Sequence, residues 1–438
     1  MADLRNQGPA SSNLLSASAA IAAMQARGMT SETLVASCLA RIQARDAELG
    51  AWAHVNPERA LEQARALDRV PAHGPLHGLP VGIKDVLDTY DMTTAHGSVI
   101  YQSAPPGNDS ACVAALRRAG AVILGKTATT EFASPIAIGV RNPHDITRTA
   151  GVSSSGSAAA VADFMVPFAI GTQTGGSVIR PAAYCGIYGY KATIGSLDRG
   201  GIRHLRPSLD TLGLFARSLE DIALLRAALI GAAPGLSAWP NEKAPRLGLC
   251  RTHEWQLARP ETQAAIASAV DKLIAAGAEI TEIILPDMFA NALDAFGVIA
   301  TVEGVRSLER EIREHLETMN PWLRQAAEKA ASITDQQYQA ALAHAAACRL
   351  HLSRVFGAVD ALITPASAGE APQQLSGIGD QSFCPLWTML HGPCVCIPAF
   401  TGPSGMPMGL QIVGPLNSDD RTIAISAWIA EALSVLPQ

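Results

Sequence analysis

Two glycine-rich segments carry the residues of this sequence that are best suited to acyl-transfer chemistry. Residues 151–157 read GVSSSGS, and residues 171–181 read GTQTGGSVIRP. Gly175 and Gly176 would let a substrate approach the backbone and would leave successive N–H groups free to point at an anion. Ser177 follows them directly, so a hydroxyl nucleophile stands beside potential oxyanion donors. The pattern favours acyl transfer, although no histidine lies near Ser177 in the sequence to act as its base.

Simpler interpretations compete with this one. Residues 151–157 could be a flexible linker, but the apolar segment AAAVA at 158–162 follows at once. Lys84 ends a short apolar strand predicted over residues 79–83, and such a lysine, taken alone, is most simply a surface residue. Residues 151–157 and Lys84 point to catalysis only in combination with the second serine segment, residues 171–181.

Other motifs resemble cofactor-binding or metal-binding sites, but the residues around them argue against that interpretation. Residues 120–127 (GAVILGKT) match the phosphate-loop pattern, but there the first glycine must follow a strand. Here a helix is predicted to end at Gly120, and residues 121–124 form the strand themselves. His73 and His77 have Gly74 and Pro75 between them, which rules out a helix aiming both rings at one metal. No G-x-S-x-G elbow occurs. We therefore expect no cofactor and no metal.

Composition narrows the class of protein further. Of 438 residues 48% are hydrophobic, enough for a large core, and the net charge of -6 comes without any Lys/Arg cluster that could bind nucleic acid. No apolar run reaches the ~18 residues of a membrane span, and the apolar stretch at 17–24 is too short. The eight scattered cysteines, of which Cys394 and Cys396 are the closest pair, are expected to be buried free thiols. A cytoplasmic location is expected.

Helical and strand-like segments alternate along the chain. Periodicity and capping predict helices over residues 17–24, 31–45, 57–67, 110–119 and 260–276, and a helical block over about 289–356. Short apolar runs predict strands over 79–83, 121–124, 280–285 and 361–364. This alternation indicates an α/β fold around a largely parallel or mixed sheet.

Taken together, the motifs resemble the amidase signature hydrolases. The family pattern consists of G-G-S-S-G-G-S, an Ala-rich helix, G-T-D-x-G-G-S-[IV]-R, P-A, C-G and G-x-K-P-T. This pattern is similar to residues 151–157, 171–181, 182–186 and 189–193. Residues 74–85 (GPLHGLPVGIKD) are similar to the segment with the catalytic lysine of the family, and residues 405–414 are similar to its closing strand. The resemblance is densest over about 74–205 and touches most of the chain. It implies one domain, 1–438, with a large mixed β-sheet covered by helices on both faces and with block 289–356 shaping the substrate site.

The resemblance also implies an unusual catalytic triad. Ser177 would be the nucleophile, Ser153 the bridging serine and Lys84 the base. The oxyanion hole would be formed by the N–H groups of Ser177 and of the three residues before it, Thr174, Gly175 and Gly176. A free lysine has a pKa of ~10.4, so general-base work near neutral pH needs a pKa lower by roughly 2 to 3 units. Burial at the end of an apolar strand can supply this, because desolvation penalises the ammonium.

Some positions depart from the family pattern. Val152 replaces a glycine before the bridging serine, which in the family follows a cis peptide bond, so Ser154 and Ser155 remain alternative bridges. Gln173 stands where the family often has Asp, and Arg180 lies three residues after the nucleophile rather than two. Residues predicted to contact the substrate are Gln173, Ser154, Tyr101 and Trp387.

The resulting expectation is a free-standing serine amidohydrolase, forming a homodimer and cleaving a small or medium amide or a related carbamate, urea or hydrazide. One alternative is the glutamine-hydrolysing subunit of a tRNA-dependent amidotransferase, which shares the motifs and requires partner subunits. The other is a catalytically inactive binding protein of the same fold.

Overall fold

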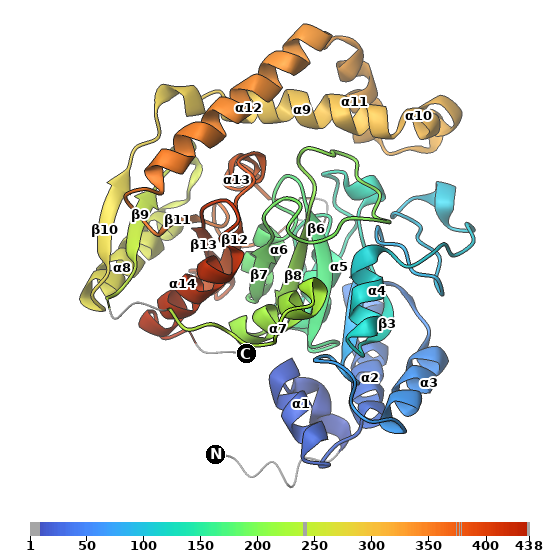
Figure 1. The fold of residues 1–438 in the computed structure, drawn as a ribbon. Coiled ribbons are helices and arrows are strands. Elements are labelled where there is room, and N and C mark those ends of the chain that lie inside the picture. Colours follow the sequence, from blue (N-terminus) through green and yellow to red (C-terminus); the bar gives the residue numbers. More distant parts are fainter. Residues whose placement is uncertain (1–8, 240–242, 374, 376, 378, 436–438) are drawn as a thin grey trace.

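An 11-stranded mixed sheet forms the centre of the molecule (Figure 1). The computed structural model describes residues 9–239, 243–373, 375, 377 and 379–435. Along the sheet the strands follow the order β1-β3-β2-β6-β8-β7-β12-β13-β11-β9-β10, and β4 and β5 form a separate pair. The strands are β1 (Trp52–Val55), β2 (Pro80–Lys84), β3 (Val122–Thr127), β4 (Arg141–Asn142), β5 (Asp145–Thr149), β6 (Phe168–Gln173), β7 (Tyr188–Lys191), β8 (Thr211–Ala216), β9 (Arg246–Cys250), β10 (Glu279–Ile283), β11 (Ala361–Pro365), β12 (Cys394–Thr401) and β13 (Pro407–Val413).

Helices cover both faces of this sheet. Helix α6 packs against β7, β12 and β13, whereas α14 packs against β12 and α7. In Figure 1, α7 and α14 lie in front of the strands. The helices are α1 (Ala17–Gln25), α2 (Ser31–Leu49), α3 (Pro57–Asp68), α4 (Ala111–Arg118), α5 (Ser155–Ala162), α6 (Ile179–Cys185), α7 (Leu219–Ile230), α8 (Pro260–Ala275), α9 (Ala292–Ser307), α10 (Glu309–His315), α11 (Pro321–Ala331), α12 (Asp335–Val355), α13 (Pro385–Met389) and α14 (Asp419–Ala432). The predicted α/β class and mixed sheet are confirmed.

The part of the sheet that positions the candidate site is parallel. Strand β2 lies between β3 and β6, parallel to both, with Ile83 opposite Ile170 of β6. Every residue of β2 is buried, which explains its continuous apolar run. Because parallel strands end at the same edge of a sheet, Lys84 at the end of β2 and the loop after Gln173 of β6 come together.

The segment that mimics a phosphate loop is a helix end followed by a strand, as predicted. Helix α4 ends before Gly120, which has φ of 88°, and residues 122–127 form β3. Lys126 is fully buried and donates hydrogen bonds to the Leu87 carbonyl and the Thr94 hydroxyl, with the Asp85 carboxylate 3.6 Å away. This lysine therefore supports the core.

Helices α9 to α12 form the block predicted over 289–356 and lie across the top of Figure 1. Two carboxylates tie this block to the sheet domain: Glu303 accepts hydrogen bonds from the backbone and hydroxyl of Ser208, and Glu131 accepts two from Asn320. Residues 287–307 are apolar and long enough to span a membrane by composition. In the structure α9 packs against α11, α12 and α13 instead.

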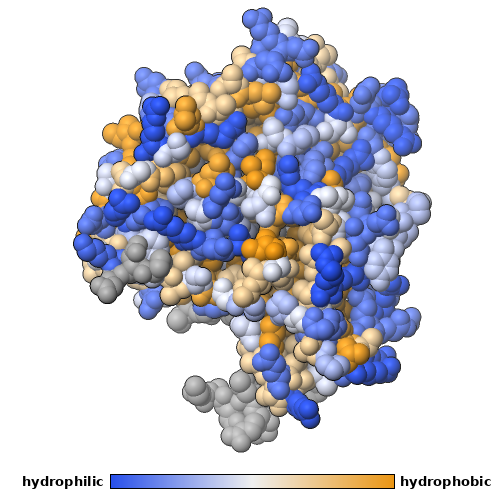
Figure 2. All heavy atoms as spheres, in the orientation of Figure 1, coloured by the Kyte–Doolittle hydropathy of each residue, from blue (hydrophilic) through white to orange (hydrophobic). Residues whose placement is uncertain are grey.

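All eight cysteines are buried and unpaired in disulfides, which confirms the prediction for these thiols. Burial raises the pKa of Cys394 to about 11 and that of Cys384 to about 12, so both are protonated at neutral pH. The face of the molecule shown in Figure 2 is mostly hydrophilic, and its apolar side chains are scattered in small groups.

Candidate active site

Lys84 lies in the interior of the protein among hydroxyl groups. Its side chain is fully buried, and Nζ is 2.9 Å from Ser153 Oγ, 2.9 Å from Ser154 Oγ and 2.8 Å from Thr172 Oγ1. The first two serines precede helix α5, which packs against β2 and β6. The structure therefore brings together Lys84 and the first serine segment, as the sequence predicted.

The surroundings of Lys84 favour its neutral form. Burial lowers the pKa of the Lys84 ammonium from 10.5 to about 7, and the negative charge of Asp210 opposes part of this effect. No carboxylate of the described residues forms an ion pair with Nζ within 4 Å. A substantial fraction of the lysine is thus unprotonated near neutral pH, as a general base requires.

A neutral lysine amine has two N–H groups and one lone pair, so one of its three hydroxyl neighbours must donate to it. Ser154 is unsuited, since its hydroxyl donates to the Thr172 carbonyl at 3.0 Å and also accepts from the Thr172 N–H. Ser155 begins α5 and makes no described contact with Nζ. Ser153 has no other described side-chain hydrogen bond, so its proton is available for Lys84. The geometry favours Ser153 over the other two serines.

The loop that carries Ser177 presents its amides to the site. Gly176 has φ of 118°, a conformation that favours glycine, and a Cβ there would come within 2.8 Å of Cys384 Cβ. Among the described residues, the backbone N–H groups of Gly175, Gly176 and Ser177 make no hydrogen bond. A cluster of free amides beside a hydroxyl can stabilise an oxyanion.

The described residues contain no hydrogen bond between Ser153 and Ser177. The Val152–Ser153 peptide bond is trans, unlike the cis bond that the family resemblance implied. Both hydroxyls belong to buried residues, and Ser177 retains 6% of its surface.

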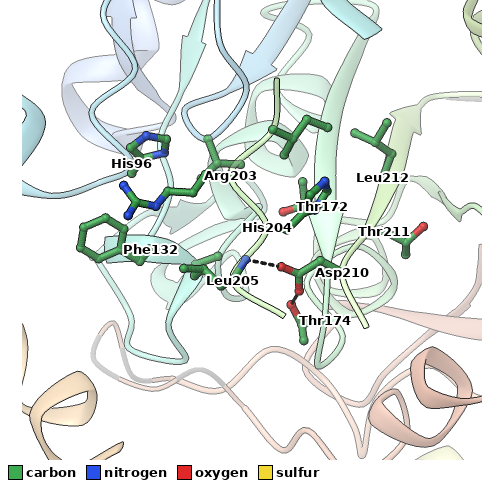
Figure 3. Close-up of a pocket in the computed structure, with 13 residues that line it drawn as sticks. His96, Phe132, Thr172, Thr174, Arg203, His204, Leu205, Asp210, Thr211 and Leu212 are labelled. Carbon is green, nitrogen blue, oxygen red and sulfur yellow. Dashed lines mark hydrogen bonds between the residues drawn. The ribbon is translucent and has the colours of Figure 1, made fainter. Parts of the chain in front are cut away.

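Asp210 holds the oxyanion loop from the side of β8. Its carboxylate accepts hydrogen bonds from the Thr174 hydroxyl and from the N–H group of Leu205, the latter at 2.9 Å (Figure 3). It also accepts one from the N–H group of Arg206 at 3.0 Å. Sequence reasoning missed both Asp210 and Thr172. Asp210 belongs to no recognisable motif, and its only signal was its place beside a strand end. Thr172 stands in the segment 171–181 that resembles the family pattern, which is the signal that could have found it.

Gln173, predicted to contact the substrate, uses its side chain within the protein. Oε1 accepts hydrogen bonds from the N–H groups of Val178 and Ile179, at 2.9 and 3.0 Å, and Nε2 donates to Thr388 Oγ1. The amide is fully buried. An uncharged acceptor here satisfies the first amides of α6 and thereby fixes the chain just after Ser177.

We expect Gln173→Ala to lower the free energy of unfolding by about 2 kcal/mol, because two buried N–H groups lose their acceptor. Urea denaturation of the variant measures this. Gln263→Ala is the control, since the side chain of Gln263, on helix α8, donates only to the Ala258 carbonyl, and its loss should cost far less. Unchanged stability with a raised KM would instead mean that Gln173 binds the substrate.

Tyr101 and Trp387 were also predicted to contact the substrate. Tyr101 is half-buried, donates to the Glu311 carboxylate and accepts from Arg203 Nη1 at 3.0 Å. Trp387 is completely buried in α13. Arg180 donates to the carbonyls of Gly379 and Asp380, so it tethers the loop before α13. Contact of Tyr101, Trp387 or Ser154 with a substrate stays a prediction.

Similarity to known proteins extends over most of the chain. Residues 33–423 match the Amidase family. The chain belongs to the amidase signature family. It is 34% identical to a glutamyl-tRNA(Gln) amidotransferase subunit of Salinispora arenicola, over 96% of this chain and 98% of that protein, and 34% identical to the corresponding subunit of Chloroflexus aggregans, over 91% and 92%.

Solved structures of family members superpose over nearly the whole chain. A crystal structure of an amidase has a TM-score of 0.88 at 30% identity, covering 95% of this chain and 99% of that one. The peptide amidase from Stenotrophomonas maltophilia has a TM-score of 0.84 at 27% identity, covering 96% and 98%. The protein is thus an amidase signature hydrolase, which acts on C–N bonds.

Proposed function

We propose that the protein is a free-standing serine amidohydrolase that cleaves a small or medium amide, or a related carbamate, urea or hydrazide, through an acyl-enzyme on Ser177. The observation that carries the proposal is the buried Lys84, with its lowered pKa, in hydrogen-bond contact with Ser153. The free amides of the loop before Ser177 support it as a second element of the same chemistry.

In the proposed reaction the Ser177 hydroxyl attacks the substrate carbonyl. Its proton passes to Ser153, whose own proton passes to the lone pair of neutral Lys84. The carbonyl oxygen becomes an oxyanion that the N–H groups of Thr174, Gly175, Gly176 and Ser177 receive. The oxyanion then collapses, and the relay returns the proton to the leaving nitrogen, which departs as ammonia or an amine. Water repeats the sequence on the acyl-enzyme, releasing the acid and restoring Ser177.

A glutamine-hydrolysing subunit of a tRNA-dependent amidotransferase is the second candidate, because relatives of that description are 34% identical over nearly the whole chain. A panel of primary amides, anilides, carbamates and glutamine, with ammonia and amine readouts, separates the candidates. Hydrolysis of several amides by the purified chain alone supports the proposal, whereas glutamine as the sole substrate supports the second candidate. An inactive binding protein would hydrolyse none. Light scattering of the same preparation measures whether the homodimer forms.

Inhibitors should distinguish the hydroxyl nucleophile from thiol and metal chemistry. We expect a fluorophosphonate to abolish activity, and thiol alkylation at neutral pH to leave it unchanged, since burial keeps the thiol of Cys384 protonated beside Gly176. Chelators should also have no effect. Residual activity after each treatment is the measurement. Full inhibition by a chelator, or inactivation by alkylation that substrate prevents, would contradict the proposed mechanism.

A further inference from the structure

A narrow recess lies among the residues labelled in Figure 3. Thr172 and Thr174 line one part of it, and Thr172 Oγ1 is also 2.8 Å from Lys84 Nζ. Phe132, His96 and His204 are among its other lining residues. Because Thr172 both lines the recess and contacts Lys84 Nζ, we infer that a group bound here would lie close to the proposed reaction centre. The recess has room for only a few atoms.

His204 lines this recess and carries a buried hydrogen-bond acceptor. Its Nε2 lies 3.1 Å from the carbonyl oxygen of Arg199, which can only accept, so Nε2 carries the proton. Burial, and next the charge of Arg199, lower the pKa of His204, so the ring is neutral at neutral pH. Nδ1 then has a free lone pair. It is buried and has no partner among the described residues.

His96 adds a second uncharged ring. Its Nδ1 is also buried without a partner among the residues that the structure describes, and burial lowers its pKa to about 3. The ring stacks at 6.2 Å from that of Phe132, which gives the recess an apolar wall. Unsatisfied buried polar atoms are costly unless a ligand or water completes them.

The charged groups at the recess are already compensated. Arg203 donates to the Glu311 carboxylate at 2.5 Å and to the Tyr101 hydroxyl, so its charge is paired. The Asp210 carboxylate is occupied by Thr174 and two backbone N–H groups. The described lining of the recess therefore lacks a free charge for the ammonium or the carboxylate of an amino acid.

We propose that this recess is the acyl subsite of the enzyme, and that it takes a small uncharged acyl group whose O–H or N–H donates to Nδ1 of His204. The inference rests on the proposed function, since it assigns the substrate class of the same site. It makes amides of small hydroxy acids better substrates than glutamine or anionic amides.

Hydroxyacetamide and methoxyacetamide test the hydrogen bond, because both release ammonia and differ in one donor. We expect wild type to favour hydroxyacetamide in kcat/KM by about 5-fold, the effect of one net hydrogen bond. His204→Leu should abolish this preference. His204→Asn, which keeps an acceptor close to the place of Nδ1, should restore part of it. Equal kcat/KM for the two amides in wild type, or a preference that persists in His204→Leu, would overturn the assignment.

Succinamate and glutamine test the charge of the recess. Wild type should hydrolyse both more slowly than hydroxyacetamide. Glu311→Gln leaves Arg203 without its counter-charge. We expect it to raise kcat/KM for succinamate relative to hydroxyacetamide by about 5-fold, which corresponds to the upper end of the free energies of partly exposed ion pairs. The control is Glu314→Gln, a surface carboxylate on α10 that pairs with Arg310 and Arg313. A wild-type preference for glutamine would contradict the subsite.

Labelling with a fluorophosphonate separates failure of the subsite from failure of the proposed function. If Ser177 is labelled and other amides are hydrolysed, loss of the hydroxyacetamide preference overturns only the subsite. If Ser177 is not labelled and no amide is hydrolysed, the proposed function itself fails.

Discussion

Ser177→Ala should abolish hydrolysis of every amide that the wild-type protein turns over. The variant loses the oxygen that forms the acyl-enzyme, and its loop still contains the free amides of Gly175 and Gly176. Binding of a substrate analogue should therefore be nearly unchanged. Turnover by ammonia release and affinity by calorimetry measure the two parts separately. Retained turnover would place the nucleophile elsewhere.

The neighbouring hydroxyls should respond very differently if Ser153 is the bridge. Ser153→Ala should lower kcat by at least about 1,000-fold, since it interrupts the path from Ser177 to Lys84. Ser154→Ala is the matched control, because Ser154 also contacts Lys84 Nζ but donates its hydroxyl hydrogen bond to the Thr172 carbonyl. Thr172→Val removes the third hydroxyl with little change in shape. Near-normal turnover by Ser153→Ala, with loss in either of the others, would move the relay to that residue.

Losses along one relay should not add. The double variant Ser153→Ala, Lys84→Met should be no slower than the slower single variant, because each change alone already disables proton transfer. Additive losses would indicate that the two residues act independently.

Lys84→Met should be inactive and should change how stability depends on pH. The folded-state pKa of about 7 lies below the unfolded value near 10.5. Between these values the unfolded chain binds more protons, so the stability of wild type rises with pH. The cost of burying the ammonium is fully present below pH 7 and disappears above about pH 10.5, at about 1.4 kcal/mol for each unit of pKa difference.

Removing the titrating group removes that slope. The stability of Lys84→Met relative to wild type should thus be greatest at pH 6, where the variant is at least as stable as wild type, and should decline as pH rises toward 9.5. Equilibrium unfolding over this range measures the difference. Lys272→Met, on the exposed side of α8, is the control and should show no such trend. A variant several kcal/mol less stable at pH 6 would identify Lys84 as a charged structural partner.

Activity should follow the same group. Because only neutral Lys84 accepts a proton, kcat/KM of wild type should rise along one limb centred near pH 7. Lys84→Arg keeps the positive charge at all accessible pH values and should be as inactive as the Met variant. An activity profile that falls between pH 6 and 8 would contradict the role of base.

The sequence allowed α2, α3 and β2 to be predicted because their signals are local. Pro57 and the caps at Thr30 and Asn56 mark the starts of α2 and α3, and the apolar run before Lys84 marks β2. The order of the 11 strands was not predictable in this way. It depends on pairings such as that of β7 with β12, two strands about 200 residues apart in the chain.

In the candidate site, too, some features could be predicted from the local sequence and others depend on the fold. Lys84 and the serines stand in motifs whose residue types suggest chemistry. The use of Gln173 as an acceptor for α6, and of Asp210 as an acceptor for Thr174, depends on side chains meeting across the fold. The pKa of Lys84 likewise comes from burial, which the sequence could suggest but not measure.

The acyl-enzyme itself gives the most direct test of the central claim. A good substrate mixed briefly with the protein and quenched in acid should leave an adduct with the mass of its acyl group, and peptide mapping should locate it on Ser177. The adduct should be absent in Ser177→Ala and should form much more slowly in Ser153→Ala. An adduct on a cysteine or on another serine, or turnover at full rate with no adduct in either protein, would contradict a Ser177 nucleophile served by Ser153 and Lys84.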